Sequence, residues 1–222
     1  MFRMILPDTL PDIVAAEEGA THDATAAQAD AAAARTRADY GRVSRWGLGL
    51  LGTFGAAIGC GLLAHMVEVL TNGHDPLGDG LIAVLVLVIA AVPLVPSLWL
   101  LLALHRSGRR LARAAGSWAA QAFREAPGSS TTGDWLAARF LSSSSDLVLR
   151  LVGSALAGLG TVFAASAVYY AIAVAPSAAG VTAGLTLTIL FASVCAGQFG
   201  GVQRIQSGAL GRVPQAAPDA RR

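Results

Sequence analysis

Lysine is missing from this sequence: all 16 basic residues are arginine, and only 14% of the 222 residues are charged. A soluble domain averages about 25% charged residues. Because 54% of the residues are hydrophobic, an ordinary soluble domain is excluded, since it would lack polar side chains for its surface. The net charge of +2 is too small to favour nucleic acid as a partner. Arginine in place of lysine, with abundant alanine, indicates a bacterial genome rich in G and C.

Cysteines and catalytic motifs are also scarce. The two cysteines, Cys60 and Cys195, stand far apart in apolar runs, so they predict neither a disulfide framework nor a zinc site. The chain has no P-loop, HExxH, GxSxG or dinucleotide-binding glycine motif. We therefore expect a protein that is not an enzyme and that has no cofactor and no metal.

Long apolar runs dominate what is present. Residues 46–70, 81–104, 151–175 and 178–199 each reach the roughly 20 residues that cross a bilayer core. Backbone polar groups in lipid must be satisfied within the segment, and the runs lack the alternation of a barrel strand, so they predict helices. The expected fold class is an all-α integral membrane protein with four transmembrane helices.

Arginines flank only one end of each predicted span. The connections at 71–80 and 176–177 contain no basic residue. Because arginine-rich connections stay in the cytoplasm, we expect both termini on the cytoplasmic side of a bacterial inner membrane. The flanking arginines are Arg35, Arg37, Arg42, Arg45, Arg106, Arg109, Arg110, Arg113, Arg139, Arg150, Arg204 and Arg212.

The spans divide the chain into five predicted parts. Residues 1–34 are acidic and become alanine-rich, and because alanine has the highest helix propensity we expect a helix over 24–40 that leads into the first span. The segment has no apolar face, so we also expect it to be partly disordered. The parts are the N-terminal segment (1–45), a first transmembrane hairpin (46–104), a cytoplasmic connector (105–146), a second hairpin (147–199) and a cytoplasmic tail (200–222).

The connector begins with residues 105–125, which we expect to continue the helix of the second span outward in an amphipathic pattern. Leu104, Leu111 and Trp118 recur every seven residues, and arginines share another face. Aromatic and arginine anchors of this kind are typical of a helix on an anionic inner leaflet, so we expect anionic lipid as a partner. Apolar residues at 134–141 predict a second short helix beyond a turn-rich break. The predicted membrane-surface residues are Arg106, Arg110, Arg113 and Trp118.

Small residues recur along three of the predicted spans. Such rows let transmembrane helices approach closely, so we expect them to be packing faces. The four-residue period of the row in the last span favours a partner helix that crosses at about −40°. The predicted packing residues are Gly52, Gly55 and Gly59 in the first span, Gly153 and Ala157 in the third, and Gly180, Gly184, Thr188, Ala192, Ala196 and Gly200 in the last.

Ionisable residues gather at one end of the first span. His65 and Glu68 lie one helical turn apart, and the following loop adds His74, Asp75 and Asp79. Ionisable groups in a membrane are costly, which makes these five residues candidates for handling ions, protons or a metal. The alternative is that they are interfacial groups near the outer surface without a functional role.

The last two spans carry a likeness to a known family. The run GLGTV at 158–162, followed by Thr186 or Thr188, resembles the proton-channel subunits of flagellar stators and their TolQ- and ExbB-type relatives. Four spans with both ends inside are also similar to that layout. The resemblance implies ion conduction, although the connector at 105–146 is much shorter than the cytoplasmic domain of that family.

Two functions are left open by the sequence. The packing faces favour an oligomerising scaffold or accessory subunit of a bacterial envelope complex, with lipid, further copies or other membrane proteins as partners. The ionisable residues and the stator resemblance favour a small ion or proton channel or transporter subunit instead.

Overall fold

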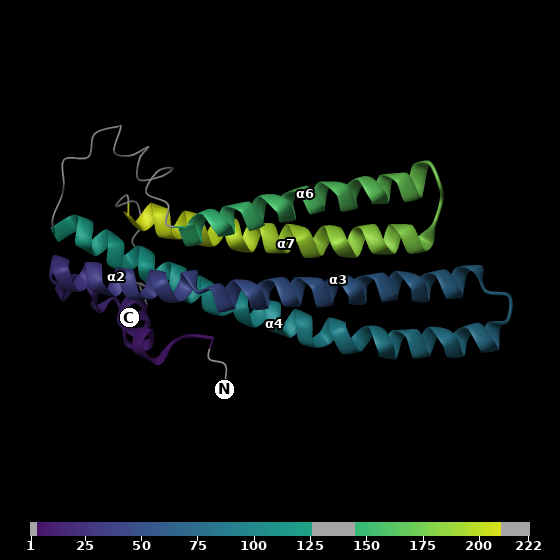
Figure 1. Ribbon diagram of the computed structural model, residues 1–222, viewed down its shortest axis with the longest axis horizontal. Coiled ribbons are helices and arrows are strands. Elements are labelled where there is room, and N and C mark those ends of the chain that lie inside the picture. The colour runs from purple at the N-terminus through teal and green to yellow at the C-terminus, as the bar shows by residue number, and fades with distance from the viewer. Residues whose placement is uncertain (1–3, 126–144, 210–222) are drawn as a thin grey trace, which may run out of the picture. The chain divides into compact units, whose positions relative to one another are not determined.

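The computed structural model describes residues 4–125 and 145–209, and all regular structure within those residues is helical (Figure 1). Four helical stretches are long and apolar enough to cross a membrane, which confirms the predicted helical class and the number of candidate spans. The predicted helix at 134–141 and residues 210–222 of the predicted tail lie outside the described residues. The helices are η1 (Pro7–Thr9), α1 (Leu10–Glu17), η2 (Ala20–Asp23), α2 (Ala26–Gly41), α3 (Val43–Asn72), α4 (Pro76–Glu125), α6 (Ser145–Ala173) and α7 (Ala178–Ala209).

The chain separates into two compact units. We call Ser44–His105 with Leu149–Phe199 the span unit. We call Met1–Val43, Arg106–Val148 and Gly200–Arg222 together the leader unit. Helices α4 and α7 contribute to both units, because neither ends where its apolar run ends. The predicted continuation of the second helix through 105–125 is confirmed by α4, and the boundary predicted after position 199 falls inside α7.

The span unit consists of two helical hairpins. A short turn at 73–75 joins α3 to α4, and another at 174–177 joins α6 to α7. Pro93 and Pro96 lie inside α4 without ending it. Large apolar side chains are exposed on all four helices, as expected for helices surrounded by lipid chains. Examples are Phe54 on α3, Val92 on α4, Phe163 on α6 and Ile189 on α7.

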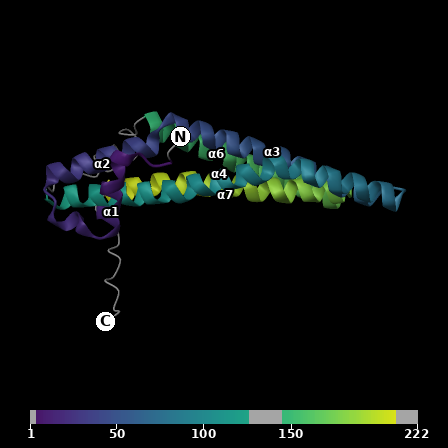
Figure 2. The same cartoon turned by 90° about the horizontal axis from the view of Figure 1, so that it is seen from below.

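The leader unit has a core of its own. Residues 4–24, which we call the leader, fold as η1, α1 and η2 and turn at Gly19, whose φ of 77° lies in the left-handed region that favours glycine. Helix α2 then begins at a capping box formed by Thr25 and Gln28. Figure 2 shows α1 and α2 beside the last turns of α4. Buried side chains of this unit include Ile13, Ala29, Ala32, Leu111, Trp118, Val202 and Ile205.

The helix predicted over 24–40 is confirmed by α2, but the partial disorder expected for residues 1–34 is wrong for residues 4–34, which are mostly helical. The prediction considered only apolar residues within the segment, and these are too few for a core. Other parts of the chain complete the core: Ile13 is fully buried, and α1 is hydrogen-bonded to Trp118 of α4. Order in the segment therefore depends on residues about 100 positions away in the sequence.

Candidate functional site

The leader contacts α4 through an ion pair and an indole. Glu17 of α1 accepts hydrogen bonds from Arg110, at 2.7 Å from Nε and 2.8 Å from Nη2. Trp118 Nε1 donates to the backbone carbonyl of Asp12 at 2.9 Å. The hydrogen bonds from Arg110 lower the pKa of Glu17 below its usual value, against a smaller opposing effect of burial. The ionised carboxylate of Glu17 therefore links the leader to Arg110 of α4.

Further contacts tie the leader to α2 and to the end of α4. The carboxylate of Asp12 accepts from Arg35 Nε and Nη2, both at 2.9 Å, and this pairing raises the pKa of Arg35. Gln121 Nε2 donates to the backbone carbonyls of His22 at 3.3 Å and Ala24 at 3.5 Å. Polar groups thus hold the leader along much of its length.

A buried carboxylate stands at the end of α2. Asp39 is 1% exposed and accepts from the backbone N–H of Leu6 at 2.9 Å and from the hydroxyl of Thr9 at 2.8 Å. It also pairs with Arg42 Nε at 2.9 Å. Arg42 separates α2 from α3, with φ −52° and ψ 129°. Asp39 therefore ties the start of the leader to the junction between α2 and α3.

The part of α4 beyond residue 105 is predicted from the sequence to lie on the membrane surface, but in the structure one of its faces contacts protein. Leu111 is fully buried and Trp118 is 6% exposed, so their seven-residue spacing defines a stripe that contacts protein. The prediction of lipid contact is therefore corrected for Trp118, and Arg110 is paired with a carboxylate. The physical reason is that an acidic segment of the same chain covers this face. Arg106 and Arg113 are exposed.

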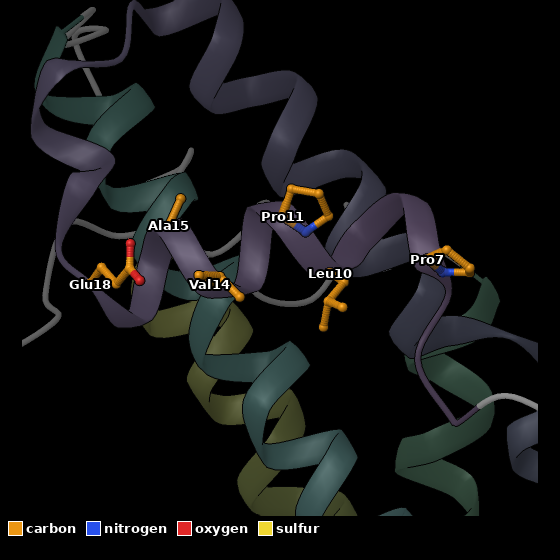
Figure 3. Close-up of a pocket in the computed structure, with 6 residues that line it drawn as sticks. All are labelled: Pro7, Leu10, Pro11, Val14, Ala15 and Glu18. Carbon is orange, nitrogen blue, oxygen red and sulfur yellow. The ribbon is translucent and has the colours of Figure 1, made fainter.

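The outward face of α1 carries a shallow apolar groove (Figure 3). Leu10 and Val14 are exposed there, by 44% and 38%. Glu18 is the only ionisable side chain in the lining. The groove is open and lacks the converging polar groups of a small-molecule site, so it does not point to catalysis. It is lined by Pro7, Leu10, Pro11, Val14, Ala15 and Glu18.

The ionisable residues predicted near the end of the first span form two separate sets of contacts. His65 Nδ1 lies 3.6 Å from Glu68 Oε2, and each side chain is 57% exposed. Asp79 accepts from the backbone N–H of Asp75 at 2.8 Å, and Asp75 accepts from that of Leu77 at 3.2 Å. The two aspartates thus satisfy free N–H groups at the start of α4, as helix caps do.

The predicted set therefore does not converge on one point in the structure. His74 is exposed in the turn between α3 and α4. Within residues 4–125 and 145–209, no three His, Cys, Asp or Glu side chains are grouped so that they could hold a metal ion. Within the set, His65 and Glu68 form a direct contact between an imidazole and a carboxylate.

The small residues of α3 form the seam of the first hairpin. A methyl group added to Gly59 would lie 2.6 Å from Leu94 Cβ, and one on Gly52 would lie 3.1 Å from a leucine side chain of α4. A methyl group on Gly55 would collide with Ser97 Oγ. Gly59 is the most restricted of the three, because its added methyl group would also lie 3.1 Å from the backbone Cα of Leu94, whereas the closest atoms at Gly52 and Gly55 belong to side chains. These three predicted packing residues therefore lie against α4 within the chain.

The row predicted on α7 is divided between two faces. A methyl group on Gly184 would lie 2.6 Å from Val168 Cγ2, and one on Gly180 would lie 2.9 Å from the nearest Cβ of α6. Ala192 and Ala196, by contrast, are exposed. A four-residue step drifts around a helix with 3.6 residues per turn, so the row cannot remain on one face. Only its first part packs on α6.

Helix α6 supplies the other side of this second seam. Ala157 is buried, and a methyl group on Gly153 would lie 3.1 Å from Gln198 Oε1 of α7. The hydroxyl of Ser154 donates to the backbone carbonyl of Cys195 at 3.2 Å. Of the two predicted packing residues, Gly153 therefore faces Gln198 of α7, and Ala157 is buried within the span unit.

The threonines on which the stator resemblance rests bond to their own helices. Thr161 donates to the carbonyl four residues earlier at 2.9 Å, Thr186 does so at 2.8 Å, and Thr188 at 2.6 Å. Hydroxyls bonded in this way satisfy themselves within apolar surroundings. Their geometry is that of ordinary threonines in membrane helices.

Asp12, Glu17 and Asp39 are anchors that the sequence analysis missed. The available signal was electrostatic, because an acidic N-terminal segment and an arginine-rich connector occur in one chain. Opposite charges favour pairing but do not fix partners. Nothing local distinguishes Glu17, which binds Arg110, from its neighbour Glu18.

No family model, no curated protein and no solved structure matches the chain. The class to which its fold points is that of multi-pass helical membrane proteins, on the basis of four helices with the length and apolar character of spans.

Proposed function

We propose that this chain is a non-enzymatic protein of a bacterial inner membrane that self-associates and acts as a scaffold or accessory subunit of an envelope complex. The supporting observation is the exposed face of α7. Five exposed residues follow one another there at alternating steps of four and three positions. They are Leu185, Ile189, Ala192, Ala196 and Phe199.

Alternating steps of four and three are the 3.5-residue repeat of left-handed helix pairs. A neighbour that crosses at about +20° can follow all five positions, whereas the four-residue row would have required about −40°. Ala192 and Ala196 stand near the middle of the face, where a partner backbone comes closest. We therefore expect α7 to be the self-association helix.

Bulky substitutions on this face test the proposal. Ala192→Trp and Ala196→Trp should each raise the dissociation constant for self-association at least tenfold, which corresponds to about 1.4 kcal/mol. Ala165→Trp is the matched control, because Ala165 is also exposed in a span but lies on α6. Energy transfer between labelled copies, diluted stepwise in lipid vesicles, gives the constants. A monomeric wild type, or equal constants for all three variants, would contradict the proposal.

Cytoplasmic termini form part of the same proposal, on the strength of the arginine distribution. Single cysteines report sidedness in a background with Cys60→Ala and Cys195→Ala. Leu77→Cys, at a position 82% exposed in the first turn of α4, should react with an impermeant thiol reagent in intact cells. Ala20→Cys in the leader should react only after the membrane is opened. The reverse pattern would overturn the orientation.

A channel is the second candidate, and the contact between His65 and Glu68 favours it. An imidazole beside a carboxylate can pass a proton. Proton flux in proteoliposomes that is lost in the double variant His65→Ala, Glu68→Gln would support a channel. Flux in the wild type no greater than in empty liposomes would remove this candidate.

A further inference from the structure

The leader occupies a face of α4 whose chemistry suits a different ligand. Residues 4–24 contain five carboxylates and no arginine or lysine. On α4, the leader's partner Arg110 stands among three further arginines, Arg106, Arg109 and Arg113, which are exposed. Glu17 binds Arg110 and also interacts electrostatically with Arg113. The leader thus provides the anion that a negatively charged lipid headgroup would otherwise provide.

Arg110 lies at a depth where lipid headgroups compete for it. It lies six positions after Leu104, the last residue of the apolar run, which is a rise of about 9 Å along a helix. The headgroup layer on each side of a bilayer is roughly 5–8 Å thick. A long arginine side chain reaches back toward that layer from beyond it. The guanidinium therefore meets phosphate and Glu17 at about the same level.

The pair between Glu17 and Arg110 is open to exchange. The two side chains are 48% and 44% exposed, so water, salt and lipid reach them. Exposed ion pairs of this kind are weakly held and easily screened. Trp118, in contrast, is 6% exposed and donates its indole hydrogen bond to the leader.

We propose that the leader is a displaceable internal ligand of α4, and that anionic lipid headgroups replace Glu17 on Arg110 and release the leader. The leader would then report on lipid composition: docked beside a neutral leaflet and released beside an anionic one. Release uncovers Trp118 and the groove-bearing helix α1 as surfaces for other contacts. Self-association through α7 is not required for this exchange.

The distance between leader and α4 tests the exchange directly. Spin labels at Ala20→Cys and Ser117→Cys, in the full chain with Cys60→Ala and Cys195→Ala, are compared in nanodiscs of phosphatidylcholine and of mixtures with phosphatidylglycerol. The distance should be short and narrow in phosphatidylcholine and should lengthen as phosphatidylglycerol increases. Glu17→Gln should shift the midpoint to a phosphatidylglycerol fraction at least threefold lower. Glu18→Gln, which removes the same charge from the adjacent residue, should match the wild type.

Each remaining outcome argues against the proposal. A distance that is the same from pure phosphatidylcholine to pure phosphatidylglycerol would show that the leader is permanently docked or permanently free. Equal midpoints for Glu17→Gln and Glu18→Gln would show an effect of net charge and not an exchange on Arg110. Inorganic phosphate, added to phosphatidylcholine nanodiscs at constant ionic strength, should leave the distance unchanged. Lengthening with inorganic phosphate would assign the site to a free anion instead of a lipid.

Discussion

The span unit and the leader unit are each stabilised internally by a different kind of interaction. In the span unit, Gly59 and Gly184 bring helices so close that an added methyl group would overlap a neighbour. In the leader unit, carboxylates hold the segments: Asp39 binds the start of the leader, and Glu17 binds α4. Within the span unit, close packing of helix surfaces holds the helices. Within the leader unit, ion pairs and hydrogen bonds hold the segments.

The difference follows from the two solvents. Lipid chains are as apolar as leucine, so apolar side chains gain little by leaving lipid, and close packing must hold the helices. In water, burial of Ile13 and Trp118 is favourable by itself, while polar groups select one arrangement among several. Changes of volume should therefore damage the span unit most, and changes of charge should damage the leader unit most.

Loss of the buried carboxylate should have the largest effect. Asp39→Ala removes the carboxylate that pairs with Arg42 and accepts from the N–H of Leu6, and breaking a buried ion pair costs about 3–5 kcal/mol. Hydrogen exchange in residues 4–24 should rise accordingly, while exchange in the parts of α6 and α7 that belong to the span unit, Leu149–Ala173 and Ala178–Phe199, should be unchanged. Asp30→Ala, at an exposed position of the same helix α2, is the control. Equal exchange in the two variants would remove Asp39 as the anchor.

Overfilling the second hairpin seam should come next. Gly184→Leu places side-chain atoms against Val168 and the carbonyl of Ala164, so we expect a loss of about 1–3 kcal/mol. Gly61→Leu is the control, because nothing lies within 4 Å of a methyl group added there. Thermal unfolding in detergent compares the two variants. If they unfold alike, the seam is not held by close packing.

Removal of the indole hydrogen bond should have a smaller effect. Trp118→Phe retains an aromatic ring but loses the donor to the carbonyl of Asp12, which we expect to cost about 1 kcal/mol. Trp99→Phe changes the same residue type at a position 67% exposed and should be neutral. Protease cleavage of the leader measures the difference. Equal cleavage of both variants would contradict a role for this bond.

Acidification should have the smallest effect. Pairing with Arg110 lowers the pKa of Glu17 below its ordinary 4.5, so its ionised form favours the docked leader. This contribution is fully present above pH 4.5 and is lost as the pH falls through the lowered pKa. Because the pair is exposed, we expect at most about 0.5 kcal/mol. Hydrogen exchange of the leader between pH 6 and 3 should show the loss in Glu18→Gln and not in Glu17→Gln.

The spans and their packing residues could be predicted because their causes lie in the local sequence. Apolar runs of span length require helices in lipid, and Gly52, Gly55 and Gly59 lie in the seam that their spacing indicated. The exposed face of α7 could not be separated from the packed face in this way. Its division between Gly184 and Ala192 depends on where α6 lies.

By itself the sequence determined an all-helical chain with four helices able to span a membrane, since hydropathy and length act within each segment. It also determined that the connector carries an apolar stripe with arginines beside it. Only the tertiary structure decided what covers that stripe, because Glu17 and Arg110 are 93 residues apart. The leader is ordered for the same reason: its core includes residues from α4, and no local pattern in residues 4–24 contains that information.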